Sequence, residues 1–278
     1  MKNIFYNLFL KEDAPKGDIT TAAIFGQKSN QTFGEIVAKE NFVLSGTKVV
    51  QDFLREKFPR LKMQTFVKEG ARVKIKKRVG KISGPIQDLL LAERVVLNLL
   101  QRLSGIATLT SRFVKIAKPH HVQILDTRKT TPGLREWERA AVRHGGGKNH
   151  RDHLSEAYLI KDNHIAACGS VTKAIRKVKT HRKKKKTKMI VEVKTLKELR
   201  EAFVERPDVI LLDNMTPTQV KRAVGLRNQL AKKVLLEISG GVTLKNLKKY
   251  VRVGVERISI GAMTHSARAV DLSLELKI

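Results

Sequence analysis

The sequence predicts an α/β fold whose second half alternates parallel strands with helices. Amphipathic stretches such as LKELREAFV separate most of six short apolar runs, and this alternation implies a parallel sheet. Six repeats favour a closed or nearly closed β/α barrel, and a doubly wound open sheet is the alternative. The runs are VQILDT (122–127), AYLIKD (157–162), MIVEV (189–193), DVILLDN (208–214), VLLEIS (234–239) and ERISIGA (256–262).

The first half of the chain has a different pattern. Residues 1–30 are predicted to be helical, with a turn at GDITT (17–21) in which Asp18 or Thr20 is a candidate N-cap. Alternating apolar and polar residues broken by glycines predict strands from Gly34 to Gly84, and residues 69–84 are predicted as two antiparallel strands joined by a turn. Apolar spacing near 3.6 residues over 86–117 predicts one long helix, or two with a break at Gly105.

Length and composition limit the class of protein. A chain of 278 residues that is 41% hydrophobic is long and apolar enough for one large or two modest globular domains. No run of 18 apolar residues occurs, so no membrane span is expected, and the first residues do not match a secretory signal. The single cysteine, Cys168, excludes an internal disulfide and fits a reducing cytoplasm, so we expect a cytoplasmic protein.

The net charge of +30 invites a nucleic-acid hypothesis. Two observations weaken it: aromatic residues make up only 5% of the chain, which leaves few platforms for base stacking, and the excess charge is spread along the sequence. The densest basic run, from Arg182 to Lys188, lies between a predicted helix and a predicted strand and is interpreted as a solvated loop. Specific nucleic-acid binding is therefore not expected, although general basicity favours the capture of anionic substrates.

Polar residues follow nearly every predicted strand of the second half. The C-terminal ends of barrel strands meet at one mouth, so cations, carboxylates and two glycine steps should converge there. The segment RHGGGKNHR (143–151) adds three consecutive glycines, whose backbone N–H groups can close around phosphate or carboxylate oxygens. Arginine adds a planar fork that binds such oxygens in pairs. The sequence therefore predicts a site for a substrate with several negative charges.

At these residues the chain resembles the quinolinate phosphoribosyltransferase family, also called nicotinate-nucleotide pyrophosphorylase (carboxylating). The resemblance runs in order along nearly the whole chain, through GDITT, AERVVLNLLQRLSGIAT (92–108), DTRKTTPGLR (126–135), RHGGGKNHR, LIKDNH (159–164), VEV, LLDN, SGG and GAMTHS (261–266). It implies an N-terminal α/β sandwich domain, here residues 1–105, and a C-terminal incomplete β/α barrel, here residues 106–278. It also implies a homodimer in which the N-terminal region of one subunit completes the site of the other.

The resemblance implies that quinolinate and 5-phosphoribosyl 1-pyrophosphate react, with Mg²⁺ as cofactor, to give nicotinate mononucleotide, pyrophosphate and CO₂ in de novo NAD biosynthesis. By the same resemblance, quinolinate is held by Arg128, His150 and Arg151, with Lys161 nearby. Arg94 would reach in from the other subunit, and Lys129 would lie between the substrates and contact the phosphoribosyl donor. A dicarboxylate needs several fixed cations if it is to be buried, which agrees with this set.

The resemblance also assigns the phosphoribosyl pyrophosphate site. Glu192 and Asp213 are expected to face the ribose hydroxyls and the Mg²⁺, directly or indirectly, and Lys129 joins them as a catalytic residue. Glu237 is either a further ribose or metal contact or part of a structural ion pair. The 5-phosphate is expected at Ser239, Gly240, Gly241, Gly261 and His265.

Two enzymes of related fold are alternatives to this interpretation. One is a paralogue associated with molybdenum-transport operons, which lacks the full HGGGxNHR segment. The other is nicotinate phosphoribosyltransferase, which shares the chemistry without decarboxylation and is not expected to carry complete DTRKTTPGLR and GGGKNHR motifs. In the motif that follows Arg135, EWERA (136–140) replaces an expected Lys-Tyr pair, and Trp137 is expected to repack the helix without disturbing the site.

Overall fold

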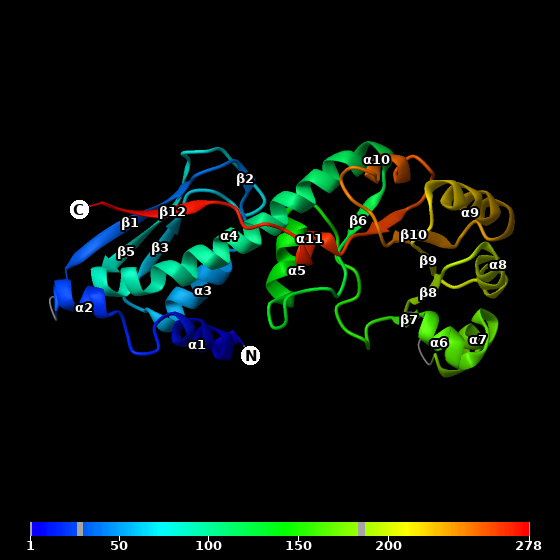
Figure 1. Cartoon of the computed structure of the whole chain (residues 1–278), viewed down its shortest axis with the longest axis horizontal. Helices are drawn as coiled ribbons and strands as arrows, with labels where there is room; N and C mark the ends of the chain where they lie inside the picture. Colours follow the sequence, from blue (N-terminus) through cyan, green and yellow to red (C-terminus); the bar gives the residue numbers. More distant parts are fainter. Residues whose placement is uncertain (1, 27–29, 183–186, 278) are drawn as a thin grey trace. The chain divides into compact units, whose positions relative to one another are not determined.

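The computed structural model describes residues 2–26, 30–182 and 187–277, and internal contacts divide the chain into two units (Figure 1). The first unit contains Met1–Ser111, Thr131–Gly146 and Ser266–Ile278, and the second contains Arg112–Thr130 and Gly147–His265. The predicted two-domain α/β architecture is confirmed. The predicted boundary at 105/106 lies within α4 (Ile86–Ala117), which contributes residues to both units, and the boundary stays a prediction.

The first unit is built around an antiparallel sheet with the strand order β12-β1-β5-β3. A two-stranded ribbon, β2-β4, and four helices besides α4 complete it. The strands are β1 (Gln31–Ala38), β2 (Phe42–Val43), β3 (Lys62–Thr65), β4 (Arg72–Val73), β5 (Arg78–Pro85) and β12 (Leu272–Lys277). The helices are α1 (Lys2–Asp13), α2 (Ile19–Phe25), α3 (Thr47–Lys57) and α5 (Arg135–His144).

The N-terminal segment forms two helices, so the prediction of one continuous helix over 1–30 is wrong. The chain leaves α1 at Asp13 and turns at Gly17, whose φ of 84° lies in the left-handed region that glycine tolerates best. Asp18 then caps α2 by accepting hydrogen bonds from the backbone N–H groups of Thr20 and Thr21, which confirms the first of the two candidate caps.

The two strands predicted within 69–84 exist, but they do not pair with each other. β4 pairs with β2, whereas β5 pairs with β1 and β3. The turn between them contains Lys76 with a φ of 65° and a hydrogen bond from Lys77 N to Lys74 O. The alternating pattern was sufficient to predict where the strands lie in the sequence, but each strand pairs with a segment elsewhere in the chain.

α4 is one uninterrupted helix, so Gly105 does not break it. A Cβ atom at Gly105 would lie 2.0 Å from the carbonyl oxygen of Arg268, which belongs to the same unit. Glycine is therefore needed here because another backbone segment crosses the helix at close range. On α5, Trp137 is buried and stacks on Tyr6 of α1 with ring centroids 5.8 Å apart, which explains how this helix is repacked.

The second unit contains a six-stranded parallel sheet with the order β6-β11-β10-β9-β8-β7. The first strand pairs with the last, whereas β6 and β7 are not paired in the described sheet, so the strands form an incomplete β/α barrel as predicted. The strands are β6 (Gln123–Leu125), β7 (Tyr158–Ile160), β8 (Met189–Val193), β9 (Val209–Asp213), β10 (Leu235–Ser239) and β11 (Arg257–Ser259).

Helices connect these strands, and α7, α8 and α9 lie on one side of them in Figure 1. The helical elements are α6 (Asp162–Cys168), α7 (Val171–His181), α8 (Leu196–Glu205), α9 (Pro217–Leu230), α10 (Leu247–Tyr250), α11 (Ala262–His265) and the short 3₁₀ turn Lys118–His120. The predicted basic loop lies mostly at 183–186, outside the described residues. Within the part of the chain that is described, no helix has the length and apolar character of a membrane span.

The strand register stacks the inward-facing residues of the barrel in layers. Residues paired in parallel strands share a face, and side chains two positions apart along a strand point the same way. The lowest layer is apolar and contains Leu159, Ile190 and Val209. The middle layer contains Glu192, Leu211, Glu237 and Arg257, and the upper layer contains Asp213, Ser239 and Ser259. Polarity thus rises toward the C-terminal ends of the strands.

Candidate active site

A cavity of about 470 Å³ opens at the C-terminal strand ends of the second unit. It brings together every predicted site residue except Arg94 and Glu237. Thr127 and Ser259, which belong to the polar strand ends expected at the mouth, also line it, as does Thr243, which was not predicted from the sequence. The predicted residues in its lining are Arg128, Lys129, His150, Arg151, Lys161, Glu192, Asp213, Ser239, Gly240, Gly241, Gly261 and His265.

Arg94 and Glu237 lie elsewhere. Arg94 is on α4 in the first unit, where it lines a separate pocket of about 270 Å³ together with Phe9, Arg102 and Trp137. Glu237 has no exposed surface and lies within the barrel rather than at the cavity wall. The role of Arg94 across a subunit interface stays a prediction.

Cations from three segments form one side of the cavity. Arg128 and Lys129 follow β6, Arg151 follows the glycine-rich segment, and Lys161 follows β7. Burial lowers the pKa of the Arg151 guanidinium, and the nearby charge of Arg128 lowers it further. The Nε atom of Arg128 is buried and has no hydrogen-bond partner in the described structure. Two guanidinium groups held so close to each other favour an anionic ligand.

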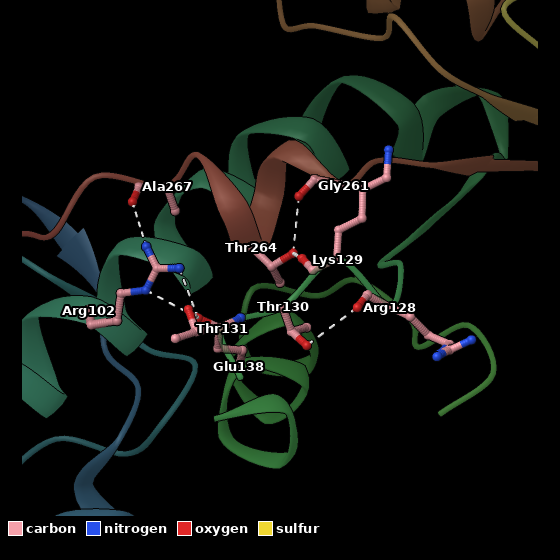
Figure 2. A network of polar contacts seen from close by, with 9 residues as sticks. All are labelled: Arg102, Arg128, Lys129, Thr130, Thr131, Glu138, Gly261, Thr264 and Ala267. Carbon is pink, nitrogen blue, oxygen red and sulfur yellow. Dashed lines mark hydrogen bonds and ion pairs between the residues drawn. The ribbon is translucent and has the colours of Figure 1, made fainter. Parts of the chain in front are cut away.

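The loop that carries Arg128 and Lys129 is fixed by hydrogen bonds within the second unit (Figure 2). The Thr264 hydroxyl lies 2.7 Å from the carbonyl oxygen of Lys129 and 3.0 Å from that of Gly261. A tight turn adds a hydrogen bond from Thr130 N to Arg128 O at 3.0 Å. Figure 2 shows the two side chains leaving this loop in different directions, so one loop can serve two ligand groups.

Glu192 and Asp213 form the acidic part of the cavity. Burial raises the pKa of the Glu192 carboxyl, the charges of Asp213 and Asp162 raise it further, and Lys161 and Lys194 act in the opposite direction. Lys161 Nζ lies 3.9 Å from Glu192 Oε2. A half-buried carboxylate with a raised pKa stabilises positive charge that develops next to it.

The glycines after β10 and β11 allow a close approach of backbone to ligand. Gly240 and Gly241 have φ values of 86° and 65°, and a Cβ atom on Gly240 would lie 2.3 Å from Asn214 Oδ1. At Gly261, a Cβ atom would lie 3.1 Å from His265 Nε2 and 3.2 Å from Lys129 Cδ. A side chain at Gly240 would therefore collide with Asn214, and one at Gly261 would crowd His265 and Lys129. The positive φ values at Gly240 and Gly241 also favour glycine, and backbone N–H groups at such turns suit phosphate oxygens.

The three glycines at 145–147 are not among the residues that line the cavity of the second unit, and their role as an anion-binding loop stays a prediction. A Cβ atom at Gly145 would lie 2.5 Å from Ala107 O, within the first unit, so that glycine serves close packing against α4. The end of the same segment does reach the site. Buried Asp126 accepts hydrogen bonds from His150 N and from Asn149 Nδ2, both at 2.6 Å.

Fixed cations, two carboxylates and a glycine-rich segment line the same cavity. Such a cavity suits a polyanionic ligand set in which one centre becomes positive during reaction. Among the described residues, no group of three or more His, Cys, Asp or Glu side chains could hold a metal ion by itself.

Comparisons with known proteins agree with this geometry. Residues 18–104 match the family model described as quinolinate phosphoribosyl transferase, N-terminal domain, and residues 106–275 match the C-terminal domain of the same family. A protein of Bacillus subtilis named probable nicotinate-nucleotide pyrophosphorylase [carboxylating] is 40% identical over 98% of this chain and 92% of its own length.

A Mycobacterium leprae protein named nicotinate-nucleotide pyrophosphorylase [carboxylating] is 41% identical over 96% of this chain and 94% of its own. The solved structure of the nicotinate-nucleotide pyrophosphorylase from Francisella tularensis superimposes with a TM-score of 0.92 at 33% identity, covering 99% of this chain and 96% of that one.

Proposed function

The chain belongs to the quinolinate phosphoribosyl transferase family, and we propose that it transfers a phosphoribosyl group from 5-phosphoribosyl 1-pyrophosphate to quinolinate with loss of CO₂. The products are nicotinate mononucleotide and pyrophosphate, which makes this a step of de novo NAD biosynthesis, and we expect it in the cytoplasm. The observation that carries the proposal is the single cavity that holds the predicted cations, carboxylates and glycines together.

Quinolinate would occupy the cationic side. Its two carboxylates would contact Arg128, Arg151 and Lys161, because a buried dicarboxylate requires several fixed positive charges. His150 lies in the same wall. The buried Nε–H of Arg128, which has no partner within the described chain, supports a role in binding this anion.

The phosphoribosyl donor would span the cavity from Lys129 to the glycine-rich wall. The 5-phosphate would lie against Ser239, Gly240, Gly241, Gly261 and His265. Glu192 and Asp213 would face the ribose, where the C1 atom gains oxocarbenium character as pyrophosphate leaves. The raised pKa of Glu192 reflects the low solvation that makes such a carboxylate effective next to a developing positive charge.

The chemistry requires no nucleophile from the protein. The pyridine nitrogen of quinolinate attacks the ribose C1, the bond to pyrophosphate breaks, and the ring becomes positively charged. That ring accepts the electron pair of the carbon–carboxylate bond next to nitrogen when CO₂ departs, and a proton replaces the carboxyl group. Positioning and electrostatic stabilisation therefore account for the catalysis expected of the site.

Glu192 and Asp213 would also hold Mg²⁺, directly or through water. Two carboxylates fit this ion, because Mg²⁺ in phosphoryl-substrate sites is commonly held by one or two carboxylates and by oxygens of the substrate phosphates. The ion would supply positive charge for the departing pyrophosphate. The lack of a larger acidic cluster among the described residues agrees with a site completed by the substrate.

We further propose a homodimer in which Arg94 of one subunit completes the site of the other. The support is the family resemblance, which assigns Arg94 to the quinolinate site of the other subunit. Mixing inactive Arg94→Ala and Arg128→Ala proteins tests this, because a hybrid dimer would contain one site with both arginines intact. Recovered activity on mixing is expected, and none would remove the shared site.

The direct test is a chromatographic assay with phosphoribosyl pyrophosphate, Mg²⁺ and either quinolinate or nicotinate. Nicotinate mononucleotide formed from quinolinate alone, with release of CO₂, is the expected result. Product from nicotinate would identify the non-decarboxylating enzyme instead, and no product from either would favour the paralogue of unknown substrate.

A further inference from the structure

We propose that Glu237 is a positioning residue of this active site, which holds His150 as the neutral Nε2–H tautomer and thereby fixes Arg151 at the cavity wall. The inference deepens the proposed function and rests on it for its kinetic consequences. His150 is, in this account, part of the scaffold that presents Arg151, and the charges that bind a dicarboxylate come from the neighbouring arginines and lysine.

Glu237 occupies an unusual position for a carboxylate. It lies in the middle of β10 with no exposed surface, on the same face as Ser239, which lines the cavity two residues further along. Neither of its carboxylate oxygens has a hydrogen bond of ordinary geometry in the described structure. Two longer contacts remain, from His150 Nε2 at 3.3 Å and from Arg257 Nη1 at 3.8 Å. A buried carboxylate without ordinary hydrogen bonds lowers the stability of the folded protein, so its presence here requires a functional explanation.

The backbone determines the protonation of His150. The N–H of Arg151 donates to His150 Nδ1 at 2.8 Å, so Nδ1 must be the unprotonated nitrogen of the ring. The ring proton is therefore on Nε2, which lies 3.3 Å from Glu237 Oε1 without a hydrogen bond of ordinary geometry. Protonation of the ring to imidazolium would place two donors against each other at Nδ1 and break the bond to Arg151 N. While this geometry holds, His150 carries no positive charge.

The surroundings of the ring favour the same state. The ionisable groups near His150 in the described structure include Glu237 on β10, Arg257 beside Glu237 on β11, Asp126 after β6 and Arg151 next in sequence. Arg257 balances the charge of Glu237, and Asp126 accepts from His150 N at 2.6 Å. The carboxylate thus attracts the Nε2–H dipole without requiring a second charge on the ring.

These contacts also fix the residue that follows. The main chain at 150–151 is held at Asp126 by His150 N, the ring is held between Arg151 N and Glu237, and Arg151 Nη1 donates to Ala157 O at 2.9 Å. Arg151 is thereby kept beside Arg128, whose charge lowers its pKa. A guanidinium placed against a like charge needs such support to stay in position before the substrate arrives.

The kinetic test uses Glu237→Gln, which keeps the size and one acceptor oxygen, and Glu237→Leu, which removes both. For Glu237→Leu we expect the KM for quinolinate to rise about 10-fold, since one positioning contact is lost, with the KM for phosphoribosyl pyrophosphate within about 2-fold of wild type. Glu237→Gln should recover part of this loss. Glu205→Gln is the matched control, because Glu205 is a nearly buried carboxylate paired with Arg176 and Lys179 and does not line the cavity.

A merely structural role for Glu237 would lower the melting temperature, lower kcat and raise both KM values without selectivity. An unchanged KM for quinolinate in a folded Glu237→Leu protein would overturn the proposal. Wild-type protein that does not convert quinolinate would remove the proposed function instead, and these two failures are therefore distinguishable.

The second test does not depend on activity. ¹⁵N NMR of the histidine rings in the full chain, with His150 assigned by comparison with His150→Gln, reports the tautomer directly. We expect the neutral form of the His150 ring to carry its proton on Nε2, and this single tautomer to be lost in Glu237→Leu. A neutral ring that carries its proton on Nδ1 in the wild-type protein would overturn the assignment.

Discussion

Glu138 in the first unit and Glu237 in the second are both completely buried, but their partners differ. Glu138 accepts from Arg102 Nη2 at 2.8 Å and Nε at 3.2 Å, and from the hydroxyl and backbone N–H of Thr131 at 2.8 and 3.2 Å (Figure 2). Within the described residues, Glu237 has only the long contacts to His150 and Arg257. One carboxylate completes a structural network, and the other lies beneath a cavity.

The arginines show the same contrast. The guanidinium of Arg102 is used within the chain, since it binds Glu138 and also donates to Ala267 O at 2.9 Å. Arg128 leaves a buried Nε–H without a hydrogen-bond partner in the described structure. Donors that are hydrogen-bonded within the chain contribute to stability. A donor that has no partner in the chain and lies at a cavity can bind a ligand instead. Substitutions in the two regions should therefore affect different measurements.

The largest effect is expected for Arg128→Ala. Removing a partly buried cation from a dicarboxylate site should lower kcat/KM for quinolinate by about 10³-fold, which corresponds to about 4 kcal/mol, because the substrate charge then loses a main partner. The melting temperature should stay near that of wild type. Steady-state kinetics and thermal unfolding measure both, with exposed Arg176→Ala as a control. A large loss of stability with little loss of activity would show that Arg128 has a structural role and does not bind the substrate.

Glu138→Ala should show the opposite pattern. It leaves Arg102 and Thr131 without their shared acceptor and should lower the free energy of unfolding by about 2 to 4 kcal/mol. Urea titration measures this change. At a temperature where the variant is folded, its KM for quinolinate should be close to that of wild type. A selective change in that KM would show that the network also positions the site.

Glu192→Gln tests the acidic side of the cavity through pH. Because burial raises the pKa of Glu192 above 4.5, the wild-type enzyme should lose activity on acidification at a higher pH than an ordinary glutamate would dictate. The variant should be about 10- to 100-fold slower at neutral pH and should lack this acid limb. An acid limb of unchanged position in the variant would assign it to another group.

Acidification should change activity and stability in opposite directions at Glu192. The folded state binds this proton more tightly than the unfolded chain, so the stability contribution of the group falls as pH rises from 4.5 through the raised pKa. The melting temperatures of the wild-type protein and of Glu192→Gln, measured across this pH range, should therefore converge at low pH. A variant that gains stability toward low pH as strongly as wild type would contradict the linkage.

The smallest effect is expected from the basic run at 182–188. Replacing Lys183, Lys184, Lys185 and Lys186 by glutamine should leave kcat unchanged and reduce kcat/KM by at most about 2- to 3-fold at low salt, because the run contributes only to long-range attraction of anionic substrates. The dependence of kcat/KM on ionic strength, compared with wild type, is the measurement. Equal salt slopes would show that the run plays no part in steering.

The sequence by itself determined the order and type of the barrel strands and the residues at their ends. Strand and helix periodicities are local properties, and parallel strands place their C-terminal ends at one edge, so the gathering of Arg128, Lys161, Glu192 and Asp213 in one cavity could be predicted. The N-cap at Asp18 is likewise a local hydrogen-bonding pattern, and its prediction was confirmed. The family motifs added the expected roles of these residues.

The tertiary structure alone decided which distant segments meet. It separated β4 from β5, explained Gly105 by the crossing of Arg268, and showed that Gly145 packs against Ala107. It also brought Glu237 into contact with His150, although residues 150 and 237 lie 87 positions apart in the sequence. Periodicity cannot reveal such contacts, because the close approach of two backbones depends on the packing of the whole unit.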